Sequence, residues 1–306
     1  PRRAVMRIGL ITILGLAAAI SVAGVTPAHA DTFETQGITI WYEVRGSGAG
    51  TPLVVANGGP GFDHSYLLCG DVWDRLAKGR KVVFYDQRGN GKSSELKEGQ
   101  PCGLAEQIDD LDALRAHLGF EKIDLLGHSW GGYLVMAYAS RHPERIAHLM
   151  IVDSGAPKIQ DTVFLFKNMY PETTEHEDGL AFAVELGDEK AIAADLHDYM
   201  TMIFYSPQAR DAFLARSSSF VYRQKVNKAV WGDLQRFDLN PELPKFKFPT
   251  LVVTGRYDFN VAPSVAYAIH KAIPGSDFAV FEKSGHLPFC EEPDGFIQRV
   301  EAFLKK

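Results

Sequence analysis

The chain has 306 residues, of which 46% are hydrophobic and 23% are charged, and its formal net charge is −6. This composition excludes a disordered, collagen-like or coiled-coil protein and indicates a globular one. A nucleic-acid partner is disfavoured, because phosphate binding needs a clustered basic face and the sequence has no block of Lys or Arg. The length allows one large α/β domain or two small ones.

The first thirty residues have the pattern of an export signal. Three arginines among the first seven residues precede an uncharged apolar run over 8–25, and a small-x-small motif follows at 28–30. We expect cleavage before Asp31, removal of residues 1–30, and a periplasmic or secreted protein without stable membrane insertion. The arginine pair also fits a twin-arginine signal, and an uncleaved membrane anchor is the alternative.

Short apolar runs alternate with helical patterns between residues 31 and 153. This alternation predicts a mostly parallel sheet with helices on both faces. In the first helical pattern, apolar residues recur three or four positions apart, and Gly119 stands where a helix cap belongs. The expected strands are Ile38–Val44, Leu53–Ala56, Lys81–Tyr85, Ile123–Leu126 and Leu149–Val152, and the expected helices are Leu104–Leu118 and Gly131–Arg141.

The alternation stops after Gly155 and resumes near residue 246. The intervening helical patterns are Val163–Met169, Gly179–Leu186, Lys190–Met202 and Ala209–Phe213. Beyond them we expect strands at Pro249–Thr254 and Asp277–Phe281 and helices at Ala262–Ile273 and Asp294–Leu304. The sequence therefore predicts one α/β core formed by residues 31–154 and 246–306, with a helical cap over 155–245. The aromatic residues of the cap either line a pocket or pack between its helices.

The three cysteines are Cys69, Cys102 and Cys290. In an oxidising compartment two of them would form a disulfide. Cys69 and Cys102 both fall in loops that we expect on the same side of the sheet, so Cys69–Cys102 is the first pairing to consider. Three free buried thiols are the alternative, because sequence alone does not fix connectivity.

The most informative motif is a Gly-x-Ser-x-Gly segment centred on Ser129. It follows an apolar strand and precedes a helical pattern. A serine at a tight strand-to-helix turn needs a strained backbone, and the flanking Gly127 and Gly131 leave room for the turn. The hydroxyl then stands clear of the sheet. We therefore predict Ser129 as a catalytic nucleophile.

A serine hydroxyl is a poor nucleophile unless a base takes its proton, and that base needs an acid to fix its tautomer. Downstream, Asp258 follows the expected strand 249–254, and His286 follows the last expected strand. The carboxyl ends of the strands are where such a sheet builds its site. The order Ser129, Asp258, His286 therefore predicts a catalytic triad, with Asp153, at another strand end, as the rival acid.

A glycine-rich loop at 57–61 follows the expected strand 53–56. Such a loop lets backbone N–H groups point into a cavity, as an oxyanion hole requires. We expect one donor from Gly58 or Gly59 and the other from Trp130, the residue after the nucleophile. Residues 86–93 end like a phosphate-binding loop, yet Asp86 stands where that motif requires glycine, so no ATP or GTP site is expected.

Together these motifs resemble the prolyl-iminopeptidase-like branch of the α/β-hydrolases, the S33 type of peptidase. The resemblance covers nearly all of residues 38–304. It implies an eight-stranded sheet, a helical cap, and cleavage of an N-terminal proline or of related amides and esters without metal or cofactor. The motifs that carry it are Gly58-Gly59-Pro60-Gly61, Asp86-Gln87-Arg88-Gly89 with Gly91 and Ser93, Gly127-His128-Ser129-Trp130-Gly131-Gly132, Gly255-Arg256-Tyr257-Asp258 and Gly285-His286.

The chain departs from that family at two places. Asn57 stands where the family's glycine-rich loop usually begins with His, and no cap segment clearly matches the acidic residues that hold the substrate's α-ammonium. Asp233, Asp238 and Glu242 are the cap candidates, and Asn57, Trp130 and Asp233 are the expected substrate-binding residues.

The leading hypothesis is a serine hydrolase of the aminopeptidase or amidase type, acting on a small molecule or short peptide. A small-molecule carboxylesterase or lactonase is the alternative within the same class. A ligand-binding protein that has kept this fold and lost catalysis is the remote alternative from another class. The oligomeric state is left open.

Overall fold

The computed structural model of the chain describes residues 28–216 and 221–306. Most of the expected export signal therefore lies outside the described residues. Within the described part, no helix combines the length and the apolar character needed to cross a membrane.

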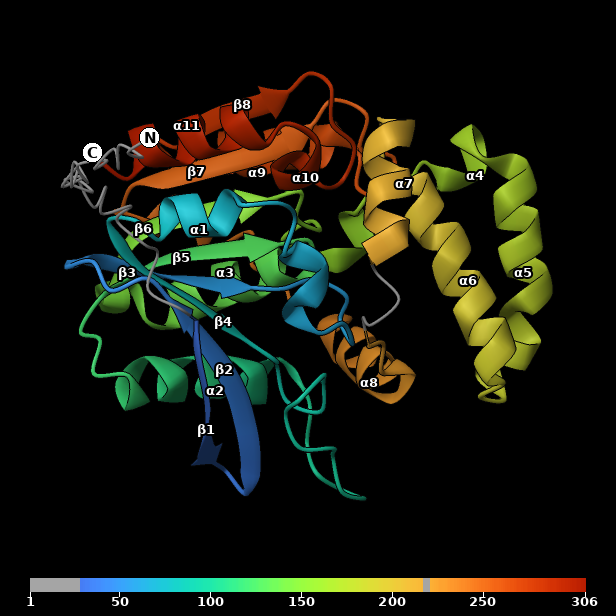
Figure 1. Cartoon of the computed structure of the whole chain (residues 1–306), viewed down its shortest axis with the longest axis horizontal. Coiled ribbons are helices and arrows are strands. Elements are labelled where there is room, and N and C mark those ends of the chain that lie inside the picture. Colours follow the sequence, from blue (N-terminus) through green and yellow to red (C-terminus); the bar gives the residue numbers. More distant parts are fainter. Residues whose placement is uncertain (1–27, 217–220) are drawn as a thin grey trace, which may run out of the picture.

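An eight-stranded sheet forms the centre of the molecule (Figure 1). Its spatial order is β1-β2-β4-β3-β5-β6-β7-β8. Strand β2 pairs antiparallel with both β1 and β4, and all other neighbouring strands are parallel. The mostly parallel sheet predicted from the residue pattern, and the eight strands that the family resemblance implies, are thus confirmed. The strands are β1 (His29–Thr35), β2 (Ile38–Arg45), β3 (Gly50–Ala56), β4 (Arg80–Tyr85), β5 (Ile123–His128), β6 (Ile146–Val152), β7 (Thr250–Gly255) and β8 (Asp277–Phe281).

Strand β1 was not predicted as a strand. It is mostly polar, and only Phe33 is buried, so it lacks the apolar alternation that marks a half-buried strand. Pairing with β2 through a tight turn at Gln36 and Gly37, both with positive φ, creates it. Because β1 begins at His29, it extends across the expected cleavage position before Asp31.

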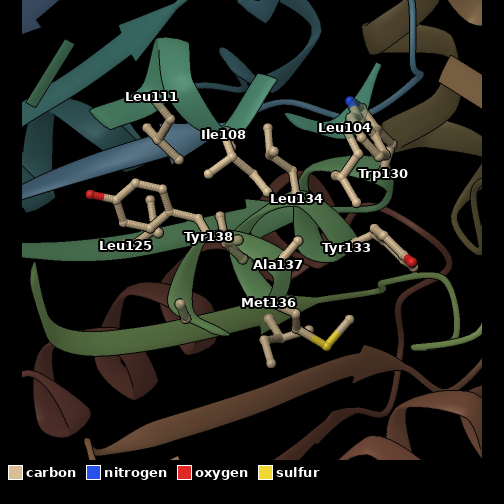
Figure 2. Packing of buried hydrophobic residues seen from close by; sticks show 14 of the residues in the cluster. Leu104, Ile108, Leu111, Leu125, Trp130, Tyr133, Leu134, Met136, Ala137 and Tyr138 are labelled. Atoms are coloured by element: carbon tan, nitrogen blue, oxygen red, sulfur yellow. The ribbon is translucent and has the colours of Figure 1, made fainter. Parts of the chain in front are cut away.

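The two faces of the sheet carry separate hydrophobic clusters. On β3, Val54 belongs to one cluster, and Leu53 and Val55 belong to the other, because side chains alternate along a strand. Figure 2 shows the first cluster, in which α2 and α3 pack against Leu125 of β5. The core helices are α1 (Val72–Leu76), α2 (Leu104–His117), α3 (Trp130–Arg141), α9 (Pro263–Ala272), α10 (Pro288–Glu291) and α11 (Pro293–Phe303).

Within the described residues, five α-helices lie between β6 and β7 in the chain, and Figure 1 shows most of them gathered to one side of the sheet. Helix α5 begins earlier than the expected 179–186, because Pro171 supplies a favourable first helical residue. Helix α8 was not predicted separately, although its buried residues Val226, Val230 and Leu234 have helical spacing. The five helices are α4 (Phe166–Met169), α5 (Pro171–Glu185), α6 (Glu189–Met202), α7 (Pro207–Arg216) and α8 (Gln224–Leu234).

The expected Cys69–Cys102 pairing is wrong, and so is the alternative of three free thiols. Cys69 is bonded to Cys290, with 5.2 Å between their Cα atoms, and Cys102 is a buried free thiol. The physical reason is the sheet itself: Cys69 belongs to the hydrophobic cluster on one face and Cys102 to the cluster on the other.

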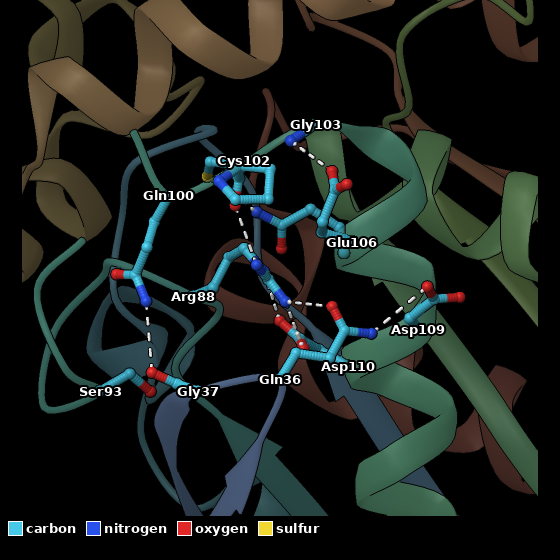
Figure 3. A network of polar contacts seen from close by, with 12 residues as sticks. Gln36, Gly37, Arg88, Ser93, Gln100, Cys102, Gly103, Glu106, Asp109 and Asp110 are labelled. Atoms are coloured by element: carbon cyan, nitrogen blue, oxygen red, sulfur yellow. Dashed lines mark hydrogen bonds and ion pairs between the residues drawn. The ribbon is translucent and has the colours of Figure 1, made fainter. Parts of the chain in front are cut away.

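A buried ion pair anchors the loop that follows β4 (Figure 3). The Arg88 guanidinium donates from Nε and Nη2 to the two carboxylate oxygens of Asp110 on α2, at 2.7 Å each, and from Nη1 to the Pro101 carbonyl. Such a bidentate pair fixes both distance and orientation. The Asp86-Gln87-Arg88-Gly89 motif therefore ties a loop beside the sheet to α2.

Candidate active site

Ser129 occupies the turn between β5 and α3. Its backbone has φ 57° and ψ −122°, in the left-handed region that non-glycine residues rarely adopt. A Cβ on Gly127 would lie 2.1 Å from the Gly131 carbonyl oxygen, and one on Gly131 would lie 2.2 Å from the Ala56 carbonyl oxygen. These two glycines therefore permit the close approach of strand, turn and helix that presents Ser129 to a cavity.

Asp258 and His286 meet behind that cavity. The His286 Nδ1 and Asp258 Oδ2 atoms are 2.7 Å apart, and both side chains are buried. Asp258 Oδ1 accepts hydrogen bonds from the backbone N–H groups of Asn260 and Val261, which fix the carboxylate. Burial lowers the pKa of His286, so the imidazole is neutral at neutral pH. With Nδ1–H donated to Asp258, Nε2 carries the lone pair that a general base needs.

In this structure Nε2 of His286 faces Asn260. The Asn260 Nδ2 atom lies 3.0 Å from His286 Nε2 and 3.0 Å from the Tyr199 hydroxyl. Ser129 and His286 line the same small cavity, yet across the described residues no hydrogen bond joins their side chains. Catalytic hydrogen bonds are often formed only when substrate is bound. Transfer of the Ser129 proton therefore requires His286 Nε2 to break its hydrogen bond with Asn260 and to form one with the Ser129 hydroxyl.

The two residues of the glycine-rich loop that could supply the expected donor, Gly58 and Gly59, are not equivalent. The Gly58 N–H donates to the Tyr66 hydroxyl at 2.5 Å, so it is already occupied. Gly59 lines the cavity beside Ser129, and Trp130 is the first residue of α3, whose N–H has no partner within the helix. Gly59 and Trp130 both line the cavity and are therefore the candidate backbone donors for an oxyanion.

A directional hydrogen-bond chain joins this loop to the histidine. His128 Nε2 lies 2.7 Å from the His286 carbonyl oxygen, which can only accept, so Nε2 carries the hydrogen. His128 Nδ1 then accepts from the Tyr66 hydroxyl at 2.7 Å, and that hydroxyl accepts from Gly58 N–H. Burial lowers the pKa of His128 well below its usual value, so this tautomer persists. These hydrogen bonds connect the glycine-rich loop, the serine turn and the His286 backbone.

The cavity above Ser129 has a volume of about 230 Å³ and combines aromatic walls with two acidic side chains. Glu177 comes from α5 and Asp195 from α6. Burial raises the pKa of Glu177 to about 7, with further repulsion from Asp195 and Asp198, and burial also raises the pKa of Asp195. The main aromatic walls are Phe62, Trp130, Tyr133, Tyr199, Tyr222 and Trp231.

Comparison with known proteins decides the family. Residues 51–293 match the alpha/beta hydrolase fold family. The proline iminopeptidase of Saccharolobus solfataricus is 32% identical over 88% of this chain and 89% of its own length. The proline iminopeptidase of Clostridium botulinum is 31% identical over 87% of this chain and 94% of its own. The chain belongs to the alpha/beta hydrolase family, in the branch that contains these relatives.

Among solved structures, a thermophilic esterase from Thermogutta terrifontis superposes with a TM-score of 0.69 at 25% identity. The match covers 92% of this alpha/beta hydrolase and 98% of the esterase. Both an iminopeptidase and an esterase are therefore similar to nearly the whole chain.

Two of the expected substrate-binding residues do not face the cavity of this hydrolase. Asn57 is buried, and its Nδ2 donates to the Phe62 carbonyl at 2.7 Å, so it supports the glycine-rich loop. Asp233 lies on the face of α8 that meets α2, where Oδ2 accepts from Leu104 N–H at 2.7 Å. The expectation that Asn57 and Asp233 bind substrate is corrected on these grounds. Trp130 does line the cavity.

Glu177 and Asp195 are the acidic residues of the cavity, and neither was predicted from the sequence. The only available signal was the acidic character of 172–178 and 188–198, and acidic helical segments usually face solvent. Only the packing of α5 against α6 shows which carboxylates turn inward.

Among the described residues, one cluster of acidic and histidine side chains is compact enough to suggest a metal site. It consists of Asp153, Asp258 and His286. The 2.7 Å separation between His286 Nδ1 and Asp258 Oδ2 is that of a direct hydrogen bond, and an ion bound at about 2.1 Å by both atoms would hold them further apart. The donor geometry fits a hydrogen-bonded network.

Proposed function

We propose that this protein is a serine hydrolase that releases an N-terminal residue, proline above all, from a short peptide or a small amino-acid amide. The observation that carries the proposal is the presence, in one cavity, of a strained Ser129 and two inward-facing carboxyl groups, Glu177 and Asp195, beside the buried His286–Asp258 pair. The similarity to two proline iminopeptidases over most of the chain supports it.

In the proposed reaction, Ser129 Oγ attacks the substrate carbonyl while His286 Nε2 takes the hydroxyl proton. Asp258 orients the imidazole and stabilises its charged form. The N–H groups of Gly59 and Trp130 hold the oxyanion, and each such donor contributes about 3 kcal/mol to transition-state stabilisation. His286 then gives its proton to the leaving amine, and water hydrolyses the acyl-enzyme by the same steps.

The acidic pair accounts for a preference for substrates with a free amine. A carboxylate in a partly buried cavity binds an ammonium more strongly than it would in water, because the local dielectric is lower. Glu177 and Asp195 come from the helices over Ser129, so an ammonium held there would place the adjacent carbonyl toward the nucleophile. We propose that residues 155–245 serve as this substrate-binding cap.

A carboxylesterase or lactonase is the second candidate, supported by the largely aromatic cavity and the likeness to a solved esterase. Hydrolysis of proline β-naphthylamide and of p-nitrophenyl esters by the same preparation separates the two. The proposal predicts a higher kcat/KM for the proline amide. Ester hydrolysis without any release from the amide would favour the second candidate, and ligand binding without either activity would favour a non-catalytic protein.

We also propose that the chain is exported, on the strength of its N-terminal charge and apolar pattern. Cleavage before Asp31 would shorten β1 by two residues and retain Phe33, its buried residue. N-terminal sequencing of the protein recovered from the periplasm or medium tests this. Recovery of only the uncleaved chain, inside the cell, would contradict it.

A further inference from the structure

Asp153 is a buried carboxyl group that the mechanism above does not use. It follows β6 directly, is 1% exposed, and has a φ of 46°, in the left-handed region. Such a conformation costs on the order of 1 kcal/mol or more in a non-glycine residue, so the surrounding structure must hold it. Its Oδ1 accepts the Gly255 N–H at 2.9 Å, whereas Oδ2 is buried without a hydrogen-bond donor among the described residues.

Asp153 lies against the acid of the proposed triad. Ligating atoms of Asp153, Asp258 and His286 lie within 4.8 Å of one another. Two carboxyl groups this close and this deeply buried do not both ionise, and burial raises the pKa of each. The pair therefore retains one proton at neutral pH.

The hydrogen bonds decide which carboxyl keeps that proton. Asp258 accepts from the backbone N–H groups of Asn260 and Val261 and from His286 Nδ1, which stabilise it as a carboxylate. Asp153 accepts one backbone N–H and has a side-chain hydrogen bond with Thr254, both of which lower its pKa, but its Oδ2 has no donor. A proton on Oδ2 satisfies that buried atom and gives the Asp258 carboxylate a further donor.

We propose that Asp153 is a positioning residue, a neutral carboxylic acid whose Oδ2–H donates to Asp258 and holds that carboxylate against His286. This inference rests on the proposed function of Ser129, Asp258 and His286. No proton is transferred from Asp153 during turnover, and its role is to fix the geometry and charge of Asp258.

Other titratable groups face this cluster from the elements packed around it. The His286 ring lies 4.7 Å from that of His128 on β5. Tyr199 of α6 and Glu291 of α10 add to the electrostatic environment of the Asp258 site. All three groups are present in every Asp153 variant, so differences between these variants are due to residue 153.

The test compares D153N, D153A and D258N in the full-length protein, using the rate of labelling by a fluorophosphonate as a function of pH. Asn reproduces a protonated Asp in shape, with an oxygen for Gly255 and an N–H donor for Asp258. We expect D153A to slow labelling by about tenfold or more, through misplacement of the triad. We expect D153N to restore the rate to within about threefold of wild type, and D258N to remain slow.

The acid limb of the pH profile reports the apparent pKa of His286, which depends on the charge at position 153. A merely structural role of Asp153 would leave that pKa unchanged. Removal of an ionised carboxylate this close would lower the apparent pKa of His286 by about one unit or more. We expect the limb of D153N to coincide with that of wild type. A downward shift of that limb, a D153N rate as low as that of D258N, or a D153A rate equal to wild type would each overturn the proposal.

Infrared difference spectroscopy provides a second test, which requires neither a folded D153A variant nor labelling by the fluorophosphonate. At pH 7 the wild-type spectrum is expected to contain a carbonyl stretching band of a protonated carboxylic acid that is missing from D153N, whereas the contribution of Glu177 is common to both and cancels in the difference. Equal bands in the two proteins would overturn the proposal. A wild-type protein that shows the band but is not labelled would instead refute the proposed function, so the two failures are distinguishable.

Discussion

At Glu177 the surroundings set the pH at which the side chain can bind a cation. Its raised pKa of about 7, caused first by burial, means that the carboxyl is largely protonated below neutral pH. The α-amine of a substrate is charged up to about pH 8. Attraction between the two is therefore strongest between about pH 7 and pH 8.

We predict that kcat/KM for an aminoacyl amide rises as the pH is raised through about 7, and that E177Q removes this rise. The loss of a buried charged hydrogen bond should raise KM about tenfold or more. The comparison variant is E175Q, because Glu175 lies on the same helix and is exposed. A p-nitrophenyl ester, which has no amine, should show neither effect, and an equal KM increase for both substrates would contradict the assignment.

The residues of the site differ in how far the sequence could predict them. Ser129, Asp258 and His286 each stand in the segment that follows a predicted strand, three to five residues beyond its end, so local motifs and the parallel sheet suffice to bring them to one edge. Glu177 and Asp195 depend on which face of a helix turns inward. Asn57 and Asp233 were misjudged because Asn57 Nδ2 donates to the Phe62 carbonyl and Asp233 Oδ2 accepts from Leu104 N–H, so neither side chain lines the cavity, and the sequence does not reveal these bonds.

The elements show the same contrast between local and tertiary causes. The parallel strands were predictable because buried strands are continuous apolar runs. Strand β1 has no such run and forms because β2 offers a neighbouring edge. The pairing of Cys69 with Cys290 likewise follows from which face of the sheet each loop covers, a property of the assembled layers.

Two glycine substitutions test how tightly α3 is packed against the sheet. In G131A the new Cβ would meet the Ala56 carbonyl oxygen at 2.2 Å, so we predict a loss of about 3 kcal/mol in the free energy of unfolding. In G179A the new methyl group meets nothing within 4 Å on α5, so we predict a gain of about 0.5–1 kcal/mol. Urea denaturation measures both, and a similar change in the two variants would contradict this packing.

On the scale of the whole molecule, the Cys69–Cys290 disulfide joins a loop to α10 across 221 residues of sequence. Cys69 lies three residues after Tyr66, whose hydroxyl accepts from Gly58 N–H of the glycine-rich loop. Cys290 lies in α10, which begins two residues after His286. Closing so long a loop restricts the unfolded chain strongly.

We therefore predict that C290S lowers the free energy of unfolding by about 2–5 kcal/mol. Dithiothreitol should destabilise the wild-type protein by a similar amount and leave C290S unaffected, as thermal or urea unfolding would show. A wild-type protein whose stability does not change once mass spectrometry has verified full reduction would contradict the prediction.

The proposed reaction depends on the claim that a strained Ser129 is an activated nucleophile, served by His286 and Asp258. Its most direct test is fluorophosphonate labelling of the purified protein, followed by mass spectrometry of the peptide that carries Ser129. We predict one label on Ser129, its loss in S129A, and a large decrease in the labelling rate of H286A. Labelling of S129A at the wild-type rate, or a folded wild-type protein that resists the probe, would contradict the claim.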